Sequence, residues 1–197
     1  MKLIYKGTYK GVIDEFDGRE EIKNATKYKE ANSTDELMKI IMWPANILQL
    51  VLLVFVIVVV GKDFFELSVF LKFLGAFVLS LVLLIPHELL HGICYKGRVY
   101  LYTNIKQLML FVVGEDALSK WGFIFMCLLP NILFGFIPFI LFLINTKWVF
   151  LGLLGVMCIP SGIGDYYNVY NTLRQVPKGA KVFMKGFNTY WYLPEEK

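Results

Sequence analysis

Residues 69–91 read VFLKFLGAFVLSLVLLIPHELLH, an apolar run that ends in two histidines and a glutamate. A helix crosses the apolar core of a bilayer with about 20 residues, so this run is long enough to span a membrane. Pro86 lacks the backbone donor that a continuous helix needs, and we expect the helix to kink or restart there. The run therefore predicts a membrane-spanning helix with ionisable side chains at its end.

Three further apolar runs cover residues 44–60, 121–144 and 148–163. The composition agrees with several spans, since 57% of the 197 residues are hydrophobic, only 18% are charged and the mean hydropathy is +0.57. An ordinary soluble domain of this length does not need so many apolar residues. We therefore expect a mainly α, polytopic membrane protein with about four transmembrane helices, whose surroundings are a lipid bilayer.

Lys and Arg are distributed unequally among the segments between these runs. Seventeen of the 20 lie in residues 1–43, 96–120 and 174–197, and three lie in the two remaining loops. Because cytoplasmic loops carry an excess of Lys and Arg, this bias places both termini in the cytoplasm of a protein integral to the cell membrane. The net charge of +4 is too small to indicate a nucleic-acid-binding protein.

The same boundaries divide the chain into three parts. Residues 1–43 form a cytoplasmic N-terminal segment, residues 44–170 the transmembrane core, and residues 171–197 a cytoplasmic C-terminal tail. Ser33-Thr34-Asp35-Glu36 matches a capping box, which predicts that a helix begins at Ser33 and continues into the first span.

Short β-rich stretches lie outside the predicted helices. Residues 98–103 and 107–113, separated by Asn104-Ile105-Lys106, predict a small hairpin between the second and third spans. In the tail, turn residues at 177–179 and 185–186 precede Tyr190-Trp191-Tyr192. That pattern favours a short sheet or an interfacial anchor.

The two histidines of the chain both lie in His87-Glu88-Leu89-Leu90-His91, the H-E-x-x-H pattern. Residues four apart share one face of a helix, so both imidazoles can converge on one zinc ion while Glu88 reaches a water on that ion. Zinc lowers the pKa of its water to about 7, and a neighbouring carboxylate can accept the proton during attack on an amide. The alternative is a structural hydrogen-bond cluster, although buried ionisable groups in a membrane span favour a functional site.

A catalytic zinc site ordinarily takes three protein ligands, so a third donor is expected. Outside the motif, Asp165 is the one acidic residue attached to a predicted span, and the charge bias places it on the same side as His91. The alternatives are Glu115 and Asp116 in the cytoplasmic loop, and Cys158 earlier in the last span.

Two amides and a serine lie near these positions. Asn168 follows Asp165 by three residues and is a candidate to hydrogen-bond a developing oxyanion or a metal ligand. Asn131, after Pro130, is the other buried amide, and either amide could instead satisfy backbone groups freed by prolines. We interpret Ser161 as a close-packing residue, because both histidines are committed to zinc and no base remains to activate it.

The chain resembles site-2 protease-type intramembrane metalloproteases, and most closely the small bacterial membrane proteins called putative zincin peptidases. The residues that carry this resemblance are the zinc motif, residues 161–165 (Ser-Gly-Ile-Gly-Asp), Asn168 and residues 177–180 (Pro-Lys-Gly-Ala). The resemblance implies zinc held by His87, His91 and Asp165, and Glu88 as general base. It also implies a bacterial membrane protein that cleaves peptide bonds in or near the membrane.

The leading functional hypothesis is thus a zinc-dependent endopeptidase acting on membrane-protein or peptide substrates. One alternative is a non-catalytic zinc-binding membrane protein with a regulatory or partner-binding role, which would have no need of Glu88. Another is a metallohydrolase of a lipid or small amide. The sequence predicts neither the substrate nor the oligomeric state.

Overall fold

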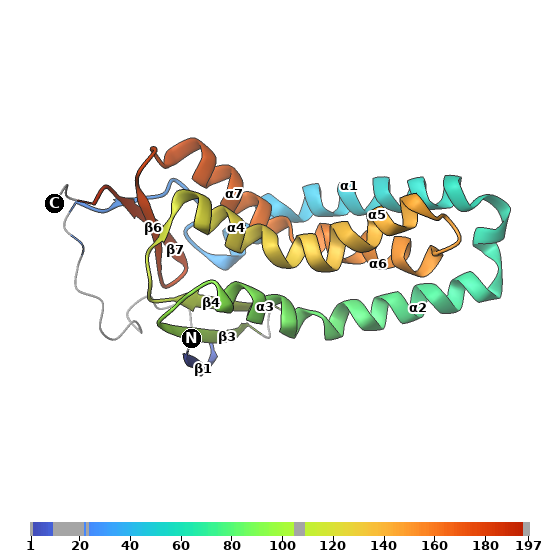
Figure 1. Ribbon diagram of the computed structural model, residues 1–197, viewed down its shortest axis with the longest axis horizontal. Helices are drawn as coiled ribbons and strands as arrows, with labels where there is room; N and C mark the ends of the chain where they lie inside the picture. Colours follow the sequence, from blue (N-terminus) through green and yellow to red (C-terminus); the bar gives the residue numbers. More distant parts are fainter. Residues whose placement is uncertain (1, 10–21, 23, 105–108, 195–197) are drawn as a thin grey trace.

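The computed structural model describes residues 2–9, 22, 24–104 and 109–194. The chain is mainly helical, as predicted, with two small sheets gathered at one end of a long helical bundle (Figure 1). Both described ends of the chain lie at the sheet end, while the turn that follows α1 lies at the opposite end.

The first helix, α1 (Thr34–Val60), begins where the capping box predicts. The Ser33 side chain accepts a hydrogen bond from the Glu36 backbone N–H at 3.1 Å, and the Glu36 carboxylate accepts one from the Asn32 backbone N–H at 2.9 Å. A short 3-10 helix, η2 (Gly61–Phe65), then turns the chain back. Gly61 has a φ of 69°, a conformation that glycine adopts without a steric penalty.

Two later helices are bent pairs. Helix α2 (Leu67–Val82) meets α3 (Leu84–Ile93) at 40°, and α6 (Val149–Ser161) meets α7 (Ile163–Gln175) at 52°. The break predicted at Pro86 is found at Leu83 instead. Pro86 lies in the first turn of α3, where an N–H has no intrahelical partner and proline is tolerated.

The remaining long helix runs from Lys120 to Ile144. It consists of α4 (Lys120–Asn131), a π-helical turn η4 (Ile132–Phe136) and α5 (Ile137–Ile144). Among the described residues, two helices are long and apolar enough to cross a membrane, Thr34–Phe65 and Lys120–Ile144, or up to four if each bent pair forms one span. The prediction of four spans therefore remains a prediction.

Helix α6 lies inside the bundle and packs against α1, α2 and α5. Its Gly152 permits close contact, because a Cβ there would lie 2.7 Å from the Phe142 ring. Helices α1 and α2 instead leave many large apolar side chains exposed, including Trp43, Leu50, Val58, Phe70, Leu71 and Val78. This outward apolar surface is consistent with association with a membrane.

The first sheet has the order β1-β3-β4. Strands β3 (Arg98–Asn104) and β4 (Met109–Gly114) pair antiparallel, in the region where two strands are predicted. The turn predicted at residues 104–106 falls largely outside the described residues. Strand β1 (Lys2–Thr8) pairs parallel with β3, an addition that the sequence does not predict.

The second sheet has the order β2-β7-β6-β5, and all its pairs are antiparallel. The predicted short sheet in the tail is present, and it also recruits two-residue strands from elsewhere in the chain. Its strands are β2 (Thr26–Lys27), β5 (Leu118–Ser119), β6 (Lys181–Lys185) and β7 (Asn188–Tyr192).

Candidate metal centre

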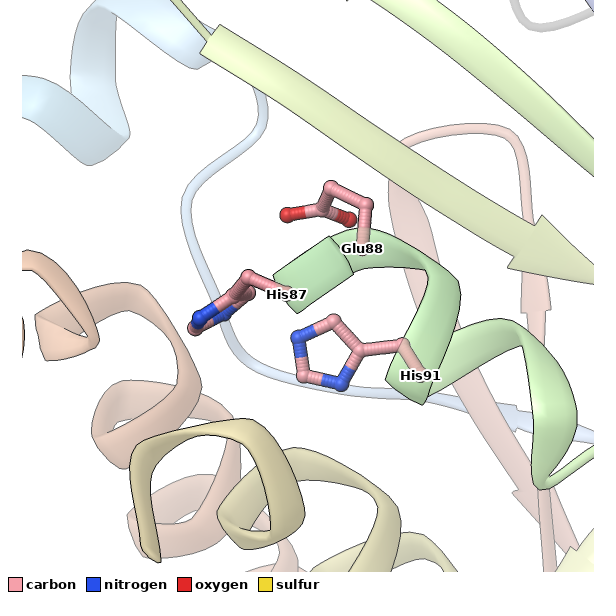
Figure 2. Close-up of side chains that lie close together, drawn as sticks. All are labelled: His87, Glu88 and His91. Carbon is pink, nitrogen blue, oxygen red and sulfur yellow. The ribbon is translucent and has the colours of Figure 1, made fainter. Parts of the chain in front are cut away.

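The H-E-x-x-H motif occupies α3, the short helix between the bundle and the sheets (Figure 1). The ring centroids of His87 and His91 lie 4.9 Å apart, as expected for two residues one helical turn apart. One potential ligand atom from each of His87, Glu88 and His91 falls within 4.8 Å of the others. Figure 2 shows the two rings side by side, with Glu88 toward the strand that passes over it. The helix thus places three metal-binding groups around one space.

Asp165, in the first turn of α7, contacts both imidazoles. Its Oδ2 lies 3.2 Å from His87 Nε2, and its Oδ1 lies 3.3 Å from His91 Nε2. These side chains are at most 15% exposed. The bend before α7 therefore brings the predicted third donor to the two predicted histidine donors across 78 residues of sequence.

The hydrogen bonds of His91 bear on whether His87, His91 and Asp165 can act as metal ligands. Its Nδ1 lies 2.8 Å from the Met126 carbonyl oxygen, which can only accept, so Nδ1 carries a proton. In the neutral ring, the lone pair of Nε2 then faces the Asp165 carboxylate, and two acceptors oppose each other. A metal ion bound to both resolves that opposition, as does a second proton on the ring that makes His91 and Asp165 an ion pair. A hydrogen bond from the remote nitrogen to a carbonyl is also the usual support of a metal-binding histidine.

Asn131, at the end of α4, holds Asp165 from the other side. Its Nδ2 donates to Asp165 Oδ2 at 2.7 Å and to the Cys127 carbonyl at 3.0 Å. Gly162 lies so close that a Cβ there would come within 1.6 Å of Asn131 Oδ1. The carbonyl that Pro130 leaves without its helical donor is that of Met126, which pairs with His91, so Asn131 does not fill the backbone role considered for it. Its contact to Asp165 is one that sequence reasoning missed. The sequence did offer one signal for this contact. Burying an amide side chain inside a helix of membrane-spanning length costs free energy unless its hydrogen bonds are satisfied.

Glu88 is oriented by the first sheet. Its Oε2 accepts a hydrogen bond of 3.1 Å from the backbone N–H of Val112 in β4. Because β4 is the outer strand of the sheet, this N–H is not needed for pairing with β3. The carboxylate is therefore held beside His87 and His91 by a backbone donor.

The alternative third donors lie elsewhere. Glu115 binds the Arg98 Nε at 2.8 Å and also the Tyr100 hydroxyl. Asp116 accepts hydrogen bonds from the backbone N–H groups of Lys96 and Gly97, which directly precede β3. Cys158 is buried in the apolar cluster of the bundle. None of the three belongs to the cluster formed by the described histidines and Asp165.

Asn168 and Ser161 flank the centre without joining it. Asn168 lines the adjacent pocket, and its side chain makes no hydrogen bond to another residue in the described part of the chain. Its role toward an oxyanion stays a prediction. Ser161 donates to the Cys158 carbonyl at 2.8 Å, but it is exposed and lines the pocket, so the close packing expected of it is not found.

A pocket of about 500 Å³ opens beside the centre. His87, Glu88, His91 and Asp165 line it together with the start of α1, strand β4 and the segment before α1. Its size falls within the range of about 300 to 1,000 Å³ that is common for ligand sites. The centre is thus accessible to a bound molecule while its own side chains are largely buried.

Comparison with known proteins gives one family. No curated protein and no solved structure matches the chain. The model of the family described as "Putative zincin peptidase" matches residues 80–181, which include all four residues of the candidate centre and more than half of the chain. The chain therefore belongs to the putative zincin peptidase family.

Proposed function

We propose that this protein is a zinc-dependent endopeptidase that hydrolyses peptide bonds in or next to a membrane, in the manner of site-2 proteases. The observation that carries the proposal is the convergence of His87 Nε2 and His91 Nε2 on the two oxygens of Asp165, at 3.2 and 3.3 Å. Two imidazoles and a carboxylate form a donor set typical of catalytic zinc.

In this proposal His87, His91 and Asp165 hold the zinc. When bound, zinc supplies a Lewis acid and a water whose pKa is lowered to about 7. Glu88 takes the proton from the attacking water and passes it to the leaving amine. The Val112 backbone N–H aims the Glu88 carboxylate, and the Met126 carbonyl aims His91. Asn131 fixes the rotamer of Asp165.

Strand β4 supports an endopeptidase over other amide hydrolases. Leu110, Phe111 and Val112 of this outer strand line the pocket beside Glu88. An extended peptide can add to the outer edge of a strand through main-chain hydrogen bonds, a mode that needs little sequence specificity. Since Glu88 already takes the Val112 N–H, the peptide would use the neighbouring backbone groups of β4. We infer that the substrate lies along β4, with its scissile bond next to Glu88.

The surroundings of the bundle support a membrane setting. Apolar helices of membrane-spanning length and the exposed apolar surfaces of α1 and α2 suit a lipid bilayer. Together with the charge bias, they favour cytoplasmic termini and a centre near the cytoplasmic face of a bacterial membrane. Membrane-protein segments are then the expected substrates.

The test is cleavage of a panel of membrane-protein segments by the purified, zinc-loaded chain in lipid nanodiscs, with Glu88→Gln as the matched inactive variant. New peptide termini should appear with the wild-type protein, disappear on chelation and return with zinc. They should be absent with Glu88→Gln, which preserves the shape of the side chain and its capacity to accept from Val112. Zinc binding without cleavage of any segment would support a non-catalytic zinc protein, and release of a fatty acid or small amine instead would support a lipid or small-amide hydrolase.

A further inference from the structure

The pocket beside the centre is strongly biased in charge. Three carboxylates line it, those of Glu30, Glu88 and Asp165, and no Lys or Arg lies among its described lining residues. Under the proposed function, the two positive charges of zinc match Glu88 and Asp165. Glu30 then remains as a negative charge that the catalytic centre does not use.

Glu30 lies in a short segment that crosses from β2 to α1, residues 28–32, which we call the strap. Hydrogen bonds tie the strap to α7, the helix that carries Asp165. They join Tyr28 to Thr172, Lys29 to Gln175 and Ala31 to Tyr167, at 3.1, 2.7 and 3.1 Å. The position of Glu30 relative to the metal centre is therefore fixed by bonds on both sides of it.

The Glu30 carboxylate is itself oriented. Its Oε1 accepts a hydrogen bond from the Thr189 backbone N–H in β7. No Lys or Arg in the described part of the chain forms an ion pair with it, although Lys27 acts on it electrostatically. A largely buried carboxylate without a paired cation is costly, and a cation bound in the pocket would offset that cost.

Apolar side chains also line this pocket. Leu37, Met38 and Ile41 of α1 line it, with Met184 of β6 and Phe187 of the turn between β6 and β7. Methionine side chains adapt to differently shaped apolar partners. This wall suits an apolar segment, whereas Glu30 suits a single positive charge.

We propose that Glu30 selects substrates in which an apolar segment is followed or preceded by a Lys or Arg, and that it binds this cationic side chain while the peptide lies at the metal centre. This inference rests on the proposed function and names its substrate class. Apolar segments flanked by Lys or Arg are typical of the cytoplasmic ends of membrane spans. Glu30 lies outside residues 80–181, so the family match does not cover this residue.

The test measures binding separately from turnover. The probes are two fluorescent peptides with the same apolar sequence, one carrying a lysine next to it and the other the uncharged norleucine, in zwitterionic detergent micelles. Each is titrated with zinc-loaded full-length protein that carries Glu88→Gln, so that no cleavage occurs. We expect the lysine peptide to bind about tenfold more tightly, as for one charge-assisted contact in a partly buried site.

Two further variants test whether the charge of Glu30 causes the lysine preference. Glu30→Gln keeps the acceptor for the Thr189 N–H but removes the charge, and should equalise the two affinities. Glu36→Gln is the matched control, because Glu36 also accepts from a backbone N–H, that of Asn32, but does not line the pocket. It should preserve the tenfold preference.

Equal binding of the two peptides by the parent protein, absence of binding by either, or a lysine preference that survives Glu30→Gln would overturn the inference. A lysine preference in a protein that cleaves no peptide would leave this inference standing and reject the proposed function. Cleavage of peptides by a protein that shows no lysine preference would support the proposed function and reject this inference.

Discussion

The Asn131 side chain donates a hydrogen bond of 2.7 Å to Asp165, the carboxylate that faces both histidines. Asn131 ends α4 and Asp165 lies in the first turn of α7, so this bond joins two helices at the level of the H-E-x-x-H motif. The neighbouring Gly162 leaves room for the amide. The rotamer of the expected third zinc ligand is thus set by a residue that does not face the metal-binding space itself.

Gly162→Ala should therefore weaken zinc binding. The φ of Gly162 is −79°, which alanine tolerates, so the added methyl acts mainly by displacing Asn131. We expect a loss of about 10 to 100-fold in zinc affinity, as for other residues that orient metal ligands. Competition with a chromogenic chelator measures it.

Gly164→Ala is the matched control for that experiment, since a Cβ at Gly164 meets no atom within 4 Å. It should bind zinc as the wild type does. If Gly162→Ala and Gly164→Ala bind zinc equally well, Asn131 does not orient Asp165 in the way inferred here.

Asp165→Ala should abolish most zinc binding, because it removes a ligand and leaves two histidines. Glu115→Ala, Asp116→Ala and Cys158→Ala should retain zinc, since these side chains lie away from the centre. Asn168→Ala should also retain zinc but turn over more slowly, as expected for a group that helps only when negative charge develops. Full zinc content in Asp165→Ala, with loss in one of the other variants, would identify a different third ligand.

Glu88→Gln should retain zinc and lose turnover by about 10² to 10⁴-fold or more, the usual effect of removing a general base. Initial rates on any cleaved segment, with zinc content measured on the same samples, give both quantities. A variant that keeps its zinc and its rate would show that Glu88 does not transfer the proton.

The local part of the centre could be predicted from the sequence, because residues four apart on a helix must share a face. The contact to Asn131 could not, since it depends on how the bend at Gly162 directs α7 toward α4. The break at Leu83 instead of Pro86 has a similar origin. Proline is disfavoured in a helix interior, although Pro44 lies inside α1, and it fits the first turn, so it indicates a break without fixing the residue.

The pairing of strands that lie far apart in the chain could not be predicted from the sequence either. Strand β1 pairs with β3 across more than 90 residues, and nothing in either strand specifies the other. Glu30 illustrates the same limit, because its place in the pocket depends on the bonds from the strap to α7. The two-residue strands β2 and β5 are too short to leave a periodic pattern.

The lysine preference attributed to Glu30 should depend on pH. Burial raises the pKa of the Glu30 carboxyl to about 7, with Thr189 and Lys27 opposing that shift. The charged and titratable side chains that act on Glu30 are Lys27 of β2, Tyr28 of the strap and Tyr190 of β7. The carboxylate is charged above its pKa and neutral below it, so the preference should be full near pH 8 and fall toward pH 5.5.

The ratio of the two peptide affinities is the quantity to follow, because effects of pH on zinc binding act on both peptides alike. A bound lysine favours the charged carboxylate and shifts the midpoint below 7. A ratio that stays constant between pH 5.5 and pH 8 would be incompatible with a Glu30 charge as its source.

The membrane orientation is tested by cysteine labelling in intact cells. Lys62 lies in the turn after α1 and Lys178 lies before β6, at opposite ends of the bundle, and both are exposed (Figure 1). A cysteine at Lys62 should react with a membrane-impermeant maleimide, whereas one at Lys178 should need a permeant reagent. The reversed pattern would place the metal centre at the outer face.

The most direct test of the centre is zinc K-edge X-ray absorption on the purified, zinc-loaded chain. Two imidazoles, one carboxylate and a water predict nitrogen and oxygen neighbours only, at about 2.0 to 2.2 Å. The multiple scattering should correspond to two imidazole rings and should weaken in His91→Ala. A sulfur neighbour at about 2.3 Å, or scattering from fewer than two imidazoles in the wild-type protein, would contradict a centre built from His87, His91 and Asp165.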